Sequence, residues 1–81
     1  MVNKFEVYSK SDCVWCDKAR ALISDKQLDY YEYKLGTDFE KENLAYLLGF
    51  PEKITLPQIF YNDKLIGGYQ ELLAYFEEHG M

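Results

Sequence analysis

The stretch Lys10-Ser11-Asp12-Cys13-Val14-Trp15-Cys16-Asp17-Lys18-Ala19 decides the fold, because it places two cysteines between a strand-like run and a helix-like run. Thiols at the Cys13/Cys16 spacing can close a small disulfide ring and reopen it. We expect Cys13 at the first turn of a helix. There the unpaired backbone N–H groups and the positive end of the helix dipole favour the thiolate, the form that attacks disulfides. The pattern therefore predicts redox chemistry.

Zinc ligation, a structural disulfide and inert core thiols are the alternatives for these two cysteines. A structural zinc site normally takes four protein ligands, and the chain offers two cysteines and the distant His79. A disulfide across so short a loop restrains the unfolded chain little. Placement at a helix start favours redox chemistry instead. In that chemistry the exposed Cys13 attacks, and Cys16, one turn deeper, resolves the mixed disulfide.

The composition is that of one small packed domain covering residues 1–81. Hydrophobic residues make up 48% of the chain and aromatic residues 17%, which excludes a disordered protein. The formal net charge of −5, without a basic cluster, argues against a nucleic-acid partner. The first residues lack the apolar segment of a signal peptide, and no later run has membrane-spanning length. We therefore expect a cytoplasmic protein without a membrane partner.

Hydrophobic periodicity predicts the element order β-α-β-α-β-β-α. The first unit consists of a strand at 4–8, a helix that is capped by Ser11 or Asp12 and runs to Lys26, and a strand at 29–35. The next helix starts from a capping box at 37–40 and ends at Gly49 and Pro51. Hairpin strands follow at 58–61 and 64–67 around Asn62-Asp63, and the last helix runs from Tyr69 to 78–80. The first β-α-β unit should be parallel and right-handed.

Apolar residues at strand and helix spacing predict which faces of these elements are buried. The expected inward sets are Phe5 with Val7, then Cys16 with Ala19 and Ile23, then Leu44 with Leu47 and Leu48, and finally Leu72 with Leu73 and Phe76. Tyr31, Tyr33 and Leu35 share a face of their strand, and with Tyr30 they are assigned to packing. The expected fold is α/β, a minimal thioredoxin-like arrangement with a four-stranded mixed sheet flanked by helices.

Three blocks of this sequence resemble the signature regions of small dithiol glutaredoxins. They are Lys10 to Ala19, quoted above, then Thr55-Leu56-Pro57-Gln58-Ile59-Phe60, and then Ile66-Gly67-Gly68-Tyr69. The blocks occur in the family's order and at its separations, and the resemblance covers essentially the whole chain. It implies a bacterial or phage type of glutaredoxin. Such a protein is a glutathione-dependent oxidoreductase of electron transport that reduces protein disulfides and glutathione mixed disulfides through Cys13 and Cys16.

The resemblance also implies a glutathione site. Lys10 would meet the glycine carboxylate, and the backbone of Leu56, before a cis Pro57, would pair with the peptide-like ligand. The helix start after Gly68 would bind the γ-glutamyl end, with Trp15 on the substrate-facing rim. The expected glutathione-binding residues are Lys10, Trp15, Thr55, Leu56, Pro57, Gly68, Tyr69, Gln70 and Glu71.

Each of these features also has a plainer interpretation. Lys10 would then be a solvated surface lysine, and Trp15 would pack at the surface of a helix start. Pro57 would be a trans proline entering an edge strand, and Gly67-Gly68 an ordinary turn. Glu71 is longer than the family's usual aspartate, which weakens the expected contact with the glutathione amine.

Val14 stands where dithiol glutaredoxins commonly carry proline, and this departure keeps two alternatives open. One is a redoxin reduced by thioredoxin reductase, although such proteins usually lack the Gly-Gly-Tyr region. The other is a cluster carrier, in which Cys13 of two glutathione-bridged subunits holds a [2Fe-2S] cluster. The favoured interpretation implies glutathione as co-substrate, glutathione reductase, and disulfide-containing or glutathionylated proteins, ribonucleotide reductase being one candidate. We expect a monomer without a resident metal.

Overall fold

The computed structural model describes residues 4–80, and its elements follow the predicted order. They are β1 (Phe5–Ser9), α1 (Val14–Asp25), β2 (Tyr30–Lys34), α2 (Lys41–Leu48), β3 (Gln58–Tyr61), β4 (Lys64–Gly67) and α3 (Tyr69–His79). Within these residues the strands form a four-stranded sheet in the order β2-β1-β3-β4. β1 pairs in parallel with β2 and antiparallel with β3, and β4 pairs antiparallel with β3. The predicted mixed sheet of a minimal thioredoxin-like fold is confirmed.

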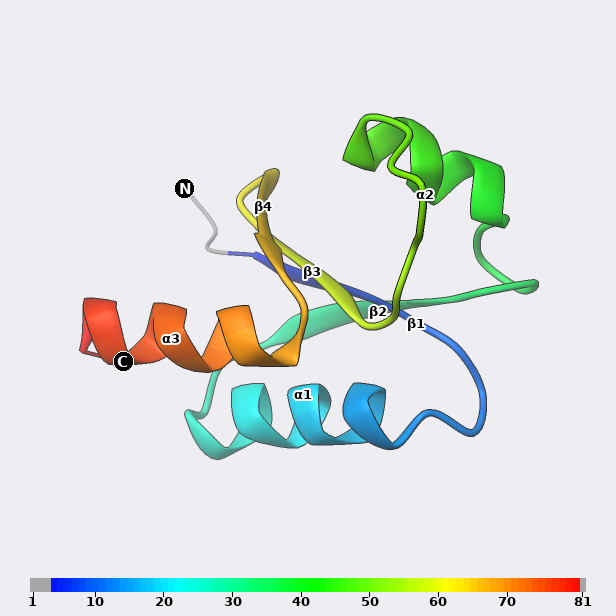
Figure 1. Cartoon of the computed structure of the whole chain (residues 1–81). Helices are drawn as coiled ribbons and strands as arrows, with labels where there is room; N and C mark the ends of the chain where they lie inside the picture. The colour runs from blue at the N-terminus through cyan, green and yellow to red at the C-terminus, as the bar shows by residue number, and fades with distance from the viewer. Residues whose placement is uncertain (1–3, 81) are drawn as a thin grey trace.

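Helices cover both faces of this sheet. In Figure 1, α1 and α3 lie side by side below the strands, and α2 lies above them. The larger core fills the space toward α1 and α3 and includes Phe5, Val7, Ala19, Ile23, Ile59, Leu72 and Phe76. The smaller core lies toward α2 and consists of Phe39, Leu44 and Phe60, with Tyr8 and Tyr33 packed against it. Successive residues of the central strands point to opposite faces, so each strand supplies both cores.

Burial confirms the predicted inward faces of α1 and α3 and corrects that of α2. Cys16, Ala19 and Ile23 are buried on α1, as are Leu72 and Phe76 on α3, while Leu73 is partly buried. On α2 Leu44 is buried and Leu48 partly buried, but Leu47 is 49% exposed. The buried face of α2 therefore follows Leu44 and Leu48, four residues apart, and Leu47 lies at the edge of this face, where it contacts solvent.

The predicted N-cap of α1 is wrong. Neither Ser11 nor Asp12 caps the helix: Cys13 does, with extended backbone, and its Sγ accepts a hydrogen bond from the Cys16 N–H at 3.2 Å. Asp12 instead has a φ of 54°, within the turn that joins β1 to α1. The turn uses Asp12 for its left-handed backbone conformation, and this leaves the cap to the next residue.

The predicted start of α2 is also wrong, because Thr37 does not cap the helix. The Thr37 and Asp38 N–H groups donate to the Lys34 carbonyl, in a turn that closes directly after β2. The N-cap is Glu40, whose N–H donates to Asn43 Oδ1 at 2.8 Å. The helix end is as predicted, with Gly49 in the left-handed conformation at φ 81°.

The hairpin between β3 and β4 turns through Asn62 and Asp63, as predicted. Their φ values of 50° and 67° are the positive values that a two-residue hairpin turn of this hand requires. Along residues 4–80 none of the helices has the length and apolar character needed to cross a bilayer.

Candidate functional site

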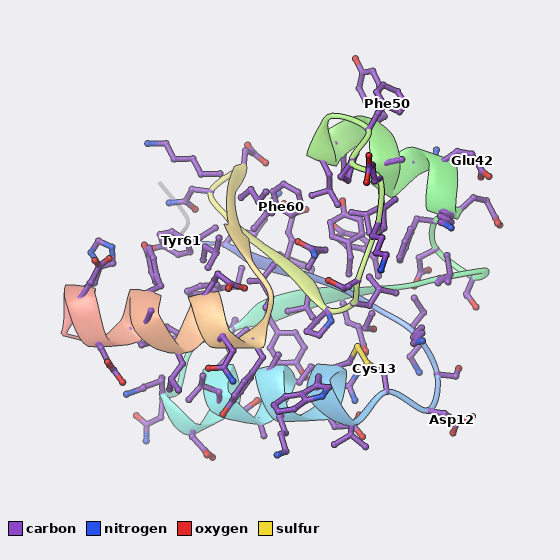
Figure 2. The ribbon with its side chains drawn as sticks, in the orientation of Figure 1. Asp12, Cys13, Glu42, Phe50, Phe60 and Tyr61 are labelled. Atoms are coloured by element: carbon purple, nitrogen blue, oxygen red, sulfur yellow. A yellow bond between two sulfur atoms is a disulfide. The ribbon has the colours of Figure 1, made fainter. Side chains whose placement is uncertain are left out.

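Cys13 and Cys16 form a disulfide at the start of α1, with their Cα atoms 5.2 Å apart. Figure 2 shows the Cys13 sulfur between the start of α1 and the loop that leads into β3. Both cysteines lie at the helix start, as expected, but one position earlier than predicted: Cys13 is the N-cap, outside the helix, and Cys16 lies in the first turn of α1. Among the described residues, no cluster of three His, Cys, Asp or Glu side chains could hold a metal ion.

The start of α1 directs backbone polarity at the Cys13 sulfur. The Cys16 N–H donates to Cys13 Sγ, and the Asp17 N–H donates to the Cys13 carbonyl at 3.1 Å. A sulfur in this position interacts with the positive end of the helix dipole. After reduction the same N–H favours the thiolate of Cys13 over its thiol.

Exposure distinguishes the two sulfur-bearing residues. Cys13 keeps 8% of its surface accessible, whereas Cys16 has none. The difference has the predicted direction, although Cys13 is less exposed than expected because the loop before β3 lies against it. Only Cys13 can be approached by a substrate sulfur without opening of the helix start.

The loop before β3 brings Leu56 against the disulfide. The Leu56 carbonyl oxygen lies 3.8 Å from Cys13 Sγ, and the Leu56-Pro57 peptide bond is cis, as the resemblance implied. The side-chain amide of Gln58 donates to the Thr55 carbonyl at 2.9 Å, which ties the two ends of this loop together. The backbone of Leu56 is therefore held beside the sulfur that reacts.

Every expected glutathione-binding residue except Lys10 lines one groove of about 260 Å³ beside this loop. We call it the cradle; it is formed by Trp15, Thr55, Leu56, Pro57, Gly68, Tyr69, Gln70 and Glu71. Trp15 is 49% exposed and its ring centroid lies 5.5 Å from that of Tyr69. Lys18 Nζ lies 4.7 Å from the Trp15 ring centroid. Trp15 thus belongs to the wall of the cradle, with a cation on one of its faces.

The start of α3 closes the far end of the cradle, and Glu71 occupies part of it. The Gly68 N–H donates to Glu71 Oε1 at 2.8 Å. Gly67 has a φ of 124°, and a Cβ atom there would lie 2.8 Å from Glu71 Cγ. Gly67 is therefore needed both for its backbone conformation and for the closeness of Glu71. The Glu71 carboxylate thus already accepts a hydrogen bond from one of the N–H groups at the helix start that the resemblance assigns to the γ-glutamyl end of glutathione.

Lys10 lies apart from the cradle, in a second groove on the other side of the Thr55-Leu56 segment. This groove of about 450 Å³, which we call the lysine groove, is lined among others by Lys10, Leu35, Phe39, Lys41, Ile54 and Leu56. The motifs did not indicate Lys41 or the apolar floor, because residues from α2 and from three loops meet there only in the folded chain. The two grooves share Thr55 and Leu56.

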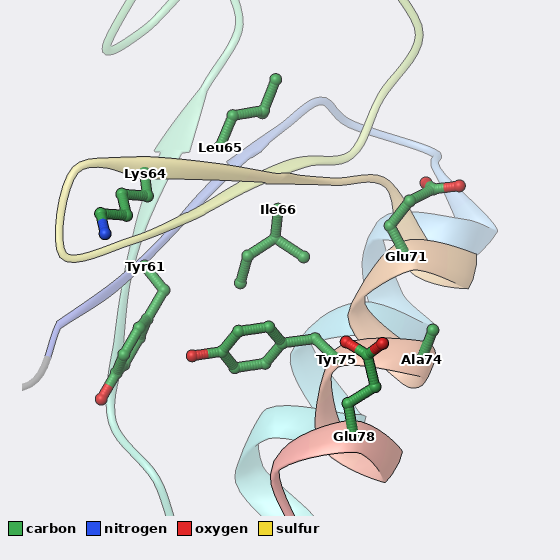
Figure 3. A pocket seen from close by; sticks show the side chains of 8 residues that line it. All are labelled: Tyr61, Lys64, Leu65, Ile66, Glu71, Ala74, Tyr75 and Glu78. Atoms are coloured by element: carbon green, nitrogen blue, oxygen red, sulfur yellow. The ribbon is translucent and has the colours of Figure 1, made fainter.

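A third groove, of about 380 Å³, lies between β4 and α3 (Figure 3). Its walls carry Lys64 on the strand, and Glu71 and Glu78 on the helix. Tyr75, which lies on α3 between Glu71 and Glu78 in the sequence, also lines this groove, and burial raises its pKa. This groove shares only Glu71 with the cradle and includes neither cysteine.

Two polar networks that sequence patterns did not predict hold the strands and helix beneath the site. The buried Ser9 hydroxyl donates to Glu32 Oε2 at 2.7 Å, and Arg20 pairs with both Glu32 and Asp17, so that α1 is tied to β2.

The second network joins β1 to β2 on the face toward α2. The Tyr33 hydroxyl donates to Glu6 Oε2 at 2.9 Å. This hydrogen bond, with burial, raises the pKa of Tyr33 to about 12. Burial and the Glu6 charge also raise the pKa of Tyr8, whose ring lies 5.0 Å from that of Tyr33.

Comparison with known families gives one family model: Glutaredoxin, which matches residues 5–66. A probable glutaredoxin from Synechocystis is 37% identical over 71 residues, covering 88% of this chain and 80% of that protein. Glutaredoxin 3 of Escherichia coli is 34% identical over 70 residues, covering 85% and 81%. The hybrid peroxiredoxin hyPrx5 of Haemophilus influenzae is 36% identical over 74 residues, and there the chain spans only 30% of the relative's length.

Solved structures agree with these relatives. Reduced Escherichia coli glutaredoxin superposes with a TM-score of 0.76 at 29% identity, over 93% of this chain and 94% of that one. The buckwheat glutaredoxin in complex with glutathione superposes with a TM-score of 0.71 at 26% identity, over 96% and 71%.

Proposed function

Because the chain belongs to the glutaredoxin family, we propose that it is a glutathione-dependent thiol-disulfide oxidoreductase that reduces protein disulfides and glutathione mixed disulfides. The observation that carries this proposal is the Cys13-Cys16 disulfide at the start of α1, with Cys13 Sγ 3.8 Å from the carbonyl of Leu56, a residue of the cradle. We also propose that residues 1–81 act as one catalytic domain.

Cys13 is the nucleophile in the proposed reaction. Its thiolate attacks one sulfur of the substrate disulfide, a mixed disulfide forms, and the other substrate sulfur leaves as a thiolate that takes up a proton. Cys16 then attacks Cys13 Sγ, which releases the second substrate thiol and forms the Cys13-Cys16 disulfide. The larger exposure of Cys13 and the Cys16 N–H directed at its sulfur support this order of events.

Glutathione restores the dithiol in two steps. One glutathione thiolate attacks Cys13 Sγ and frees Cys16; a second attacks the glutathione sulfur of that mixed disulfide, which releases glutathione disulfide and the Cys13 thiolate. The cradle supplies peptide-like pairing through Leu56 and an apolar wall through Trp15 and Tyr69. The glutathione complex of the buckwheat relative supports the choice of ligand.

The proposal is tested by an assay that couples NADPH oxidation to turnover with two alternative electron donors. With a disulfide substrate, glutathione plus glutathione reductase should sustain turnover, and thioredoxin reductase alone should sustain it poorly. Efficient turnover with thioredoxin reductase and none with glutathione would transfer the assignment to a redoxin of the thioredoxin-reductase type. Visible absorbance after anaerobic reconstitution with iron and sulfide, at the expense of turnover, would point to a cluster carrier.

A further inference from the structure

Helices cover the two faces of the sheet unequally. One face carries α1 and α3, of 12 and 11 residues, whereas the other carries α2, of 8 residues. In Figure 1, α2 lies above the C-terminal end of β1 rather than over the whole sheet. The exposure of side chains on this face therefore shows which part of the sheet α2 leaves open.

One row of side chains crosses this face on all four strands. Glu6 on β1 is in register with Tyr31 on β2 and with Phe60 on β3. Phe60 is in register with Leu65 on β4. Residues in register point to the same face, and Figure 3 shows Leu65 directed away from α3. Tyr31 is 56% exposed and Leu65 50% exposed. We call this row, together with Leu47 of α2, the open strip.

The open strip contains a small pocket between the sheet and α2. The pocket has a volume of about 180 Å³ and is lined by Glu6, Tyr8, Leu47, Phe60 and Asp63. Phe60 is buried and forms its floor, while Leu47 is half-exposed at its side. An apolar side chain that entered the pocket would remove surface of both residues from water, which is favourable.

The charge beside this pocket is negative. Glu6 Oε2 accepts a hydrogen bond from the Tyr33 hydroxyl and lies 3.6 Å from Lys4 Nζ. Asp63 is exposed, and in residues 4–80 it forms no ion pair. After burial, the charges of Glu6 and Asp63 are the causes that raise the pKa of Tyr8. A basic side chain next to the pocket would therefore find a carboxylate partner in Asp63.

A helix is the occupant that fits this surface. The central strands use their backbone groups within the sheet, so a segment on its face must satisfy its own backbone hydrogen bonds. The row spans three interstrand steps, about 14 Å, which is close to the width of one helix with its side chains, about 10 to 12 Å. A second copy of this chain does not fit, because face-to-face copies would bring the Glu6 and Asp63 carboxylates of both together.

We propose that the open strip docks an amphipathic helix of a partner protein, whose apolar stripe covers Leu47 and Leu65 and carries a Lys or Arg that pairs with Asp63. This surface goes beyond the proposed reaction, since the strip contains neither cysteine and no residue of the cradle. The row crosses β1 at Glu6, whereas Cys13 follows the C-terminal end of that strand. A partner docked on the strip leaves Cys13 accessible.

Fluorescence anisotropy of labelled synthetic helices tests the inference. The first peptide, of about 18 residues, carries a stripe of Leu flanked by Arg. A second peptide has Glu in place of Arg, and a third has Ser in place of Leu. The first should bind about five to ten times more tightly than either of the others, because the second meets like charge and the third buries little apolar surface. The difference between the first and second peptides should shrink as salt is added.

Leu47→Asp and Tyr46→Asp are a matched pair of variants on α2. Tyr46 is 72% exposed and does not line the pocket. Tyr46→Asp should therefore keep the affinity for the first peptide, whereas Leu47→Asp should lower it about tenfold.

Asp63→Asn tests the charge without disturbing the turn, because Asn also tolerates the left-handed conformation at φ 67°. It should weaken binding of the first peptide about two- to fivefold and strengthen binding of the second. Glu52→Gln removes an exposed carboxylate outside the pocket and should change neither.

Equal affinities of the three peptides, or equal effects of Leu47→Asp and Tyr46→Asp, would overturn the inference, as would no binding of the first peptide. Inhibition of glutathione-supported turnover by the first peptide would also overturn it, because the peptide would then occupy the cradle or the lysine groove. Failure of the proposed function is a separate result. A protein that did not use glutathione would still give the same order of peptide affinities.

Discussion

Replacing Glu71 by lysine separates the structural role of this residue from its expected role in binding glutathione. In the wild-type protein Glu71 Oε1 accepts the Gly68 N–H at 2.8 Å, at the N-terminus of α3. Glu71→Lys removes this hydrogen bond and puts a positive charge at the positive end of the helix dipole. Since each effect is worth about 0.5 to 1 kcal/mol at an exposed helix start, the free energy of unfolding should fall by about 1 to 2 kcal/mol.

The same substitution should weaken glutathione binding through charge repulsion. The added ammonium lies in the cradle where the glutathione amine is expected, and Glu71 is exposed to solvent. An exposed charge pair is worth about 1 kcal/mol or less, so the apparent KM for glutathione should rise by up to about fivefold. Chemical reduction by dithiothreitol should stay unchanged, because it uses none of these contacts.

Two measurements on three variants separate the effects: urea unfolding, and the glutathione dependence of turnover. Glu71→Gln keeps an acceptor for the Gly68 N–H but loses the charge, so most of the stability should return while the KM stays raised. Glu78→Lys, on the same helix but outside the cradle, should leave the KM unchanged. An unchanged KM for glutathione in Glu71→Lys would mean that Glu71 acts only as a capping residue of α3 and does not contribute to glutathione binding. A lowered KM would mean that its carboxylate competes with glutathione for the helix start.

Three further outcomes are expected. Cys13→Ser should lose all activity in the coupled assay, because a hydroxyl is a far weaker nucleophile at neutral pH. Cys16→Ser should still remove glutathione from mixed disulfides, which needs only the first thiol. Turnover by Cys13→Ser would contradict the mechanism. Trp15 emission should change on reduction, because a neighbouring disulfide quenches indole, and a spectrum indifferent to dithiothreitol would place Trp15 away from the site. The free energy of unfolding should fall between pH 10 and pH 12, since the hydrogen bond to Glu6 raises the pKa of Tyr33 to about 12. The stabilisation is complete below pH 10 and lost as the pH rises through 12. In urea unfolding measured at a series of pH values, Tyr33→Phe should therefore show a smaller fall in the free energy of unfolding over this range.

Local patterns were sufficient to predict the elements, and the family resemblance was sufficient to indicate the residues that line the cradle. The strands alternate, the helices repeat at helical spacing, and the hairpin turns at Asn62-Asp63, which tolerate positive φ. The cradle was predictable because each of its three parts is a short contiguous motif, around Trp15, Leu56 and Gly68. Once the topology is that of the family, three local motifs suffice to bring these parts together.

The lysine groove and the polar networks were not predictable in this way. Lys41 belongs to no motif, and it lines one groove with Lys10 only because the fold brings the end of β1 near the start of α2. The pairing of Ser9 with Glu32 likewise depends on the β1 and β2 register, which a single sequence does not state residue by residue. Long-range contacts between unremarkable surface residues leave no periodic signal, so sequence patterns miss them even where the fold is clear.

The incorrect cap at α1 shows how the fold and the chemistry share one interaction. Ser11 and Asp12 are better N-caps than cysteine by residue preference, and the sequence therefore predicted them. Cys13 takes the position because its sulfur accepts the Cys16 N–H that a serine or aspartate oxygen would otherwise accept. A stronger cap one or two residues earlier would lengthen the helix and turn that N–H into an ordinary intrahelical donor. The sulfur would then lose its nearest backbone donor, so this chain uses a weak capping residue to keep the helix start available to its reactive thiol.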